Sequence, residues 1–165
     1  MKNTVNILLI MLLAGPCITA QEVKVVAVND ITSHNTGVPA PVPPGLQLGQ
    51  LMGQMAENLK DEAFTGFFRG VKKDFTVAVT TTSDPGGLAS ALQKLEDGLT
   101  PLAMDPGWGA VKFKWREDAA TARSIETIAD LLRKLQLHIT PSFFKNEWQT
   151  VKPGWQASFK GLMNE

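Results

Sequence analysis

The chain of 165 residues is 44% hydrophobic and 19% charged, which is typical of one folded globular domain and not of a disordered segment. Its 16 basic and 16 acidic residues give a formal net charge of zero. A nucleic-acid-binding protein is therefore not expected, because such proteins gather Lys and Arg against the phosphates.

The first 20 residues have the pattern of a cleaved export signal. After Lys2 comes an apolar run at residues 7 to 13, and the next charged residue is Glu22. The run is shorter than the roughly 20 apolar residues of a membrane-spanning helix, and Gly15-Pro16 interrupts it. We predict cleavage after Ala20, which would make the remaining chain a periplasmic or secreted protein of a bacterial envelope.

Cys17 is the only cysteine and offers an alternative interpretation of this segment as a lipid anchor. Pro16 lies directly before it and makes a poor cleavage site, because proline fixes the backbone and lacks an N–H. Lipidation through Cys17 is therefore kept as the minor alternative. Removal of the signal would leave a chain without cysteine, and disulfides, thiol nucleophiles and Cys-ligated metals would then be excluded.

Three regions are predicted after the signal. Residues 21 to 29 are rich in Val, with Val23, Val25 and Ala27 on one face, and are predicted to form an N-terminal strand. Residues 30 to 45 contain four prolines, which favour extended neighbours, and are predicted to form a semi-rigid linker. Residues 46 to 165 are predicted to form a single domain that begins with a helix at residues 46 to 71, bent near Thr65-Gly66.

Within this domain, alternation of apolar and polar residues predicts strands at residues 74 to 82 (DFTVAVTTT) and 110 to 116, with Phe113 and Trp115 facing the core. A short strand is also predicted at residues 137 to 140.

Two more helices are predicted between and after these strands. One begins at Pro85 with Asp84 as its cap, because Asp accepts hydrogen bonds from the first N–H groups and Pro fits the first helical position. The other covers residues 119 to 136, with Asp130 and Lys134 paired on its outer face. A short helix and a helical tail are expected after Ser142. The predicted fold is therefore α+β, a small mixed sheet of about four strands packed with three or four helices, and a small α/β fold with parallel crossovers is the alternative.

Two features suggest a surface that binds a partner. Glycines spaced four residues apart share one face of the first helix and let another backbone approach, while an apolar stripe follows the same helix. The sequence Pro-Gly-Trp occurs at residues 106 to 108 and again at residues 153 to 155, where each Trp could offer an aromatic platform. In both cases the simpler interpretation is packing inside the domain. The predicted partner-binding residues are Gly45, Gly49, Gly53, Leu48, Leu51, Met52, Met55, Trp108 and Trp155.

The predicted function is non-enzymatic: assembly or binding of a protein partner in the envelope, with self-association as one form of it. No catalytic motif is found, and neither a cofactor nor a metal site is expected. One alternative is a secreted hydrolase that uses His138, Asp105 and Glu147. The other is a protein that acts on membranes, without spanning them, through residues 45 to 59.

Overall fold

A computed structural model describes residues 41–163, which fold into six α-helices and three short 3-10 turns. The predicted export signal, the N-terminal strand at residues 21 to 29 and all but the end of the linker lie outside the described residues. The helices are α1 (Pro44–Asn58), α2 (Gly66–Thr81), α3 (Pro85–Gly98), α4 (Trp108–Thr121), α5 (Ile125–His138) and α6 (Trp148–Met163), and the turns are η1 (Asp61–Ala63), η2 (Pro101–Ala103) and η3 (Pro141–Phe143).

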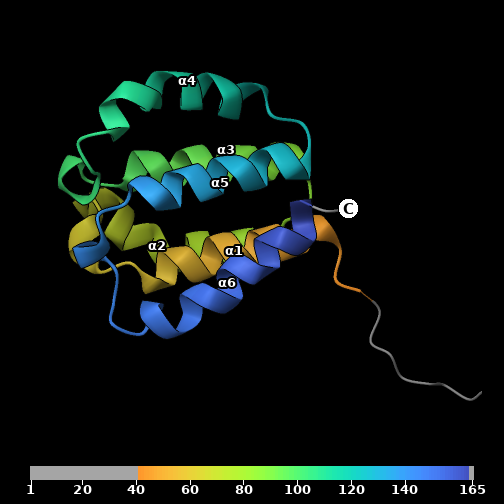
Figure 1. The fold of residues 1–165 in the computed structure, drawn as a ribbon, viewed down its shortest axis with the longest axis horizontal. Coiled ribbons are helices and arrows are strands. Elements are labelled where there is room, and N and C mark those ends of the chain that lie inside the picture. Colours follow the sequence, from red (N-terminus) through yellow and green to blue (C-terminus); the bar gives the residue numbers. More distant parts are fainter. Residues whose placement is uncertain (1–40, 164–165) are drawn as a thin grey trace, which may run out of the picture. The chain divides into compact units, whose positions relative to one another are not determined.

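The predicted α+β fold is wrong, and so is its α/β alternative. Residues 41–163 contain no β-sheet and form a helical bundle, in which extended backbone is paired only at three isolated bridges. Figure 1 shows the helices of this bundle running along a common direction. The predicted strands within these residues are parts of helices.

The segment DFTVAVTTT, predicted as a strand, is the second half of α2. Phe75 and Val79 are buried and lie four residues apart, whereas Val77, which a strand would bury beside them, is 58% exposed. The threonines fit a helix because their hydroxyls donate to carbonyls one turn earlier, as Thr80 Oγ1 does to Thr76 O at 3.1 Å. Packing of the apolar stripe therefore outweighs the weak helix propensity of β-branched residues.

The predicted strand at residues 110 to 116 lies in α4. Trp115 is buried, but Phe113 is 76% exposed, so the two residues predicted to face the core together point to different sides. The predicted helix at residues 119 to 136 covers the end of α4 and most of α5, because Ser124 caps a new helix by accepting a hydrogen bond from Thr127 N at 3.2 Å.

Other predicted elements also have different boundaries in the structure. The helix predicted at residues 46 to 71 is α1 and the start of α2, separated by η1. The strand predicted at residues 137 to 140 is the end of α5 and one bridge residue, Ile139. The tail after Ser142 is η3 followed by α6.

Two local predictions are confirmed. α3 begins at Pro85, and the carboxylate of Asp84 accepts a hydrogen bond from Gly87 N at 2.8 Å. On the outer face of α5, Lys134 Nζ lies 2.7 Å from Asp130 Oδ2. Caps and pairs one turn apart depend only on nearby residues, and this makes them readable from the sequence.

The six helices are three hairpins that repeat every 40 residues. Each hairpin consists of an inner helix (α1, α3 or α5), a 3-10 turn and an outer helix (α2, α4 or α6). Buried residues of similar type recur at equivalent positions, namely Leu48, Leu88 and Ile128; Leu59, Leu99 and Ile139; Phe68, Trp108 and Trp148; and Phe75, Trp115 and Trp155. The chain therefore builds one core from three copies of the same supersecondary unit.

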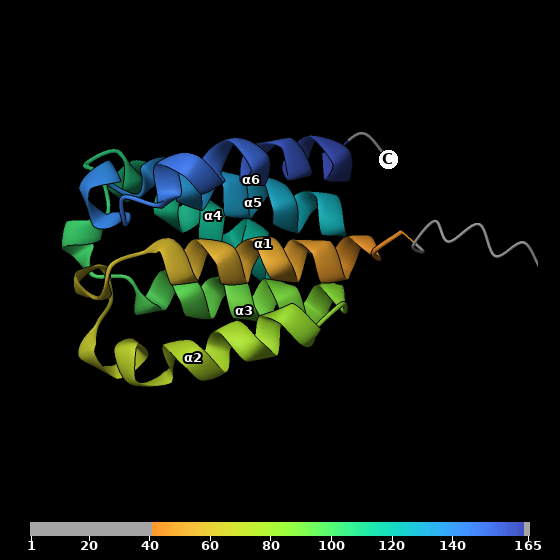
Figure 2. The same ribbon diagram turned by 90° about the horizontal axis from the view of Figure 1, so that it is seen from below.

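The turns of the three hairpins join into a closed ring at one end of the bundle (Figures 1 and 2). Antiparallel bridges connect Phe64 with Leu99, Met104 with Ile139, and Phe144 with Leu59. Each bridge is flanked by two backbone hydrogen bonds; the pair that joins the third hairpin to the first runs from Lys60 N to Phe143 O at 2.9 Å and from Lys145 N to Asn58 O at 2.8 Å. The third hairpin thus closes back on the first.

Tryptophans of the outer helices connect neighbouring hairpins inside the core. Trp115 Nε1 on α4 donates to Leu131 O on α5 at 2.9 Å, and Trp155 Nε1 on α6 donates to Leu51 O on α1 at 2.8 Å. The inner helices also pack on one another. Each outer helix therefore leans on its own inner helix and on that of the next hairpin.

Candidate functional site

All nine residues predicted to bind a partner are buried in the bundle. α1 contributes Leu48, Leu51, Met52 and Met55 to the core, α2 covers Gly45, Gly49 and Gly53, and Trp108 and Trp155 are core residues of α4 and α6. In this structure residues 45 to 59 present neither their glycine face nor their apolar stripe to a partner or a membrane.

The glycine stripe allows α2 to lie directly on α1. A Cβ atom at Gly49 would lie 2.0 Å from Val79 O, and one at Gly45 would lie 2.2 Å from Ser83 O. At Gly53 the nearest atom would be Thr80 Cγ2 at 3.1 Å. These separations leave no room for side chains at the first two positions, so the stripe serves close helix packing within the first hairpin.

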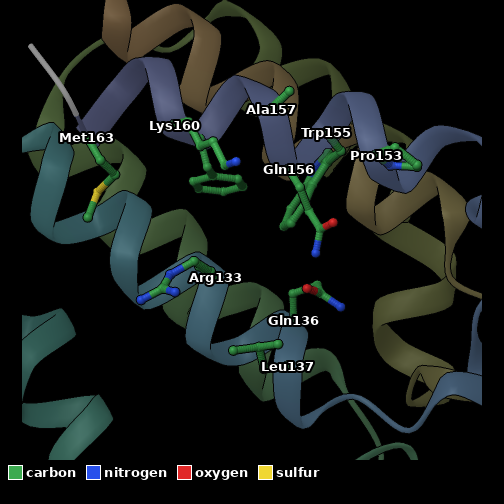
Figure 3. A pocket seen from close by; sticks show the side chains of 10 residues that line it. Arg133, Gln136, Leu137, Pro153, Trp155, Gln156, Ala157, Lys160 and Met163 are labelled. Carbon is green, nitrogen blue, oxygen red and sulfur yellow. The ribbon is translucent and has the colours of Figure 1, made fainter.

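The third hairpin has larger side chains around the position of Gly53. Arg133 of α5 replaces Gly53, and the two threonines that pack on Gly53 are replaced by Gln156 and Lys160 of α6. Pro153 also lies within α6 and lacks the N–H that a helix residue donates. Between α5 and α6 lies a cleft of about 600 Å³ (Figure 3), at the place where α1 and α2 are in contact.

In the second hairpin the corresponding interface is occupied by a buried carboxylate. Glu96 of α3 is 4% exposed and stands at the position that Gln136 holds in α5. It accepts hydrogen bonds from Trp108 Nε1 at 3.3 Å and Arg116 Nε at 2.8 Å, and Lys112 Nζ lies 2.9 Å away. The charge is thus paired and hydrogen-bonded, and it joins α3 to α4.

Gln136 is buried to the same degree but lacks such partners. It is 5% exposed, and its carboxamide has no hydrogen bond to any other described residue. The position of Arg116 is occupied by Gln156, and Figure 3 shows the two carboxamides pointing toward each other across the cleft. Among the described residues, Thr100 Oγ1 is the one side-chain polar atom that is both buried and unpartnered, so the Gln136 amide is open to solvent in the cleft. The cleft therefore contains unused hydrogen-bonding capacity in its wall.

The rim of the cleft is positively charged. Arg133 comes from α5 and Lys160 from α6, and no acidic residue is among the described residues that line the cleft. Arg133 Nη2 lies 2.7 Å from Asp130 Oδ1 outside it, whereas Lys160 forms no ion pair with the described residues. Burial raises the pKa of Asp130, but hydrogen bonds and charges from Arg133 and Lys134 outweigh this and lower the pKa overall.

The remaining walls are apolar. The buried rings of Trp155 and Phe159 form one side, with ring centroids 4.5 Å apart, and Leu137 and Met163 stand largely exposed toward the two ends. The site combines aromatic surface, two amides and two cations, which is the usual composition of a binding cleft.

The histidine and the aspartate considered for a hydrolase lie together between the second and third hairpins. His138 Nδ1 is 3.1 Å from both carboxylate oxygens of Asp105, which also accepts from Trp108 N at 3.1 Å and so caps α4. Glu147 is exposed before α6 and takes no part in this pair. The groove beside His138 has no Ser, Thr or Cys among its described lining residues, so no hydroxyl or thiol nucleophile accompanies the pair there.

This pair predicts a dependence of stability on pH. The hydrogen bond from His138 is the main cause that lowers the pKa of Asp105 below its usual 3.8. A carboxyl group whose pKa is lower in the folded than in the unfolded state stabilises the fold at pH values above its unfolded-state pKa. This contribution is lost as the pH falls through the folded-state pKa. Asp105→Asn keeps the cap and removes the charge, so it should destabilise the protein at pH 5 and to a smaller extent at pH 2.

Urea unfolding at pH 5 and at pH 2 tests this expectation. His138→Gln should also reduce the dependence of stability on pH. Equal losses of stability at pH 5 and pH 2 in Asp105→Asn would contradict the assignment.

Of the residues that line the cleft, only Trp155 was predicted to have a role. The signal that would have located the others is the repeat: Leu-Thr-Pro at residues 99 to 101 recurs as Ile-Thr-Pro at residues 139 to 141. The two Pro-Gly-Trp sequences obscure this repeat, because they pair Trp108 with Trp155, and these residues do not hold equivalent positions in it.

Within residues 41–163, no group of three or more His, Cys, Asp or Glu side chains is arranged to hold a metal ion. The helices of this part of the chain lack the length and apolar character that crossing a bilayer requires. No protein-family model, curated protein or solved structure matches the chain. The chemistry of the cleft is therefore the basis on which its function is argued.

Proposed function

We propose that this protein is an exported, non-enzymatic binding protein of the cell envelope and that the α5–α6 cleft is its binding site. The observation that carries the proposal is the carboxamide of Gln136, which faces the cleft from a largely buried residue and has no hydrogen-bond partner among the described residues. The amide itself is open to the cleft, so a bound molecule can pair with it in place of solvent. Export is supported by the pattern of the first 20 residues, and mass spectrometry of the N-terminus tests it: an intact Met1 would contradict it.

The cleft is tested by filling it. Gln156 lines the cleft on α6, is exposed and points into the cleft (Figure 3), so Gln156→Trp places an indole in the opening without changing the core. Ala120→Trp is the control, because Ala120 is exposed on α4 and does not line the cleft. Binding partners retained from envelope extracts by the wild-type protein should be retained by the control and lost by Gln156→Trp.

Thermal unfolding establishes that both variants fold. If the wild type and both variants retain the same proteins in equal amounts, or retain none, the cleft is not a partner-binding site and the proposal fails.

A further inference from the structure

We infer that the α5–α6 cleft takes an extended, acidic peptide segment of a partner protein; this inference rests on the proposed function and names the ligand class of the same site. Its geometric basis is that the two facing helices bring three kinds of group to one cleft: cations, carboxamides and apolar side chains.

The carboxamides favour a peptide backbone. Gln136 and Gln156 come from opposite walls, and each side chain can both donate and accept a hydrogen bond. A peptide unit offers the complementary pair, one N–H and one C=O, and an extended segment leaves these groups available on its two edges. A lipid acyl chain offers neither, so its binding would remove the amide of Gln136 from solvent without providing a hydrogen-bond partner.

The cations set the charge of the segment. Arg133 and Lys160 lie on opposite walls in the half of the cleft closer to Met163 (Figure 3), and no acidic residue is among the described lining residues. Asp130 is already shared between Arg133 and Lys134. An Asp or Glu side chain of the ligand would therefore find one cation from each wall, and a basic ligand would be repelled.

The volume of the cleft and its aromatic wall determine the length and the apolar character of the bound segment. About 600 Å³ lies within the range of sites that hold small molecules or short segments, and it is too small for a folded domain. The indole of Trp155 and the ring of Phe159 provide one apolar surface. The expected segment is a few residues long and has one large apolar side chain beside its acidic residue.

A phage-displayed library of random peptides, selected on the purified protein, tests the inference. Selected peptides should carry Asp or Glu near Leu, Phe or Trp, and Gln156→Trp should abolish their enrichment. For a synthetic peptide of the selected sequence, calorimetry should show binding weakened about tenfold or more by an Asp→Asn or Glu→Gln change in the peptide. Gln136→Leu should weaken binding to a similar extent, and Lys160→Gln several-fold.

Lys160 is exposed, so its replacement keeps the test valid even if Gln136→Leu does not fold. Dodecanoate is the comparison probe. If dodecanoate binds in the cleft and no acidic peptide is enriched, or if enriched peptides bind equally well to Lys160→Gln and Gln136→Leu, the inference is overturned. Loss of envelope partners in Gln156→Trp would still support the proposed function in that case, and so the two failures can be told apart.

Discussion

Gly49→Ala should lower the free energy of unfolding by about 2 kcal/mol, whereas Gly70→Ala should raise it by up to about 1 kcal/mol. Both substitutions add one methyl group to the interior of a helix, and Ala is the better helix former in each case. The difference comes from the surroundings. The added Cβ at Gly49 would lie 2.0 Å from the carbonyl oxygen of Val79, and the one at Gly70 meets no atom within 4 Å.

A backbone carbonyl cannot rotate away as a side chain does, so α1 and α2 would have to separate along the stripe. Equilibrium denaturation with urea measures both changes, and the slope of the transition checks that each variant still unfolds as one unit. Stabilisation by Gly49→Ala would show that α2 does not lie on α1 as described here.

Trp155→Ala should destabilise the protein by about 3–5 kcal/mol, the range for removal of a large buried aromatic residue. The indole lies between Trp148 and Phe159, at centroid distances of 5.3 Å and 4.5 Å, and its Nε1 donates to Leu51 O on α1. Its removal would leave a cavity and also break a contact that holds the third hairpin to the first.

Phe113→Ala is the matched control, because this ring is 76% exposed on the neighbouring outer helix and its loss should change stability by no more than about 0.5 kcal/mol. Thermal or chemical unfolding separates the two results. Equal, small effects of both substitutions would mean that α6 is not docked through Trp155.

The sequence predicted local features and failed on the fold class for a definite reason. The Asp84 cap and the Asp130–Lys134 pair depend on residues within one helical turn, and both were predicted. The alternation in DFTVAVTTT was read with a period of two, although Phe75 and Val79 fit a period of four equally well. Only the exposure of Val77, which depends on packing between hairpins, distinguishes the two patterns.

The cleft could not be predicted from the sequence, for a related reason. Gln136 has no distinguishing neighbours in the chain. Its lack of the partners that Glu96 has on α4 is seen only in the folded bundle. The residues that widen the interface, Arg133 and Lys160, read as ordinary exposed charges on helices. A search for repeats at a spacing of 40 would have aligned these positions, but not their partners.

Closure of the third hairpin onto the first limits how this architecture can change. Open solenoids lengthen by adding units at either end, since each unit touches only its neighbours. Here every hairpin is already bridged to both of the others. A fourth copy could enter only if an existing pair of backbone hydrogen bonds between two hairpins were broken. Diversity in such a molecule arises by altering the interfaces within individual units, as the glycine, carboxylate and glutamine versions in this chain illustrate.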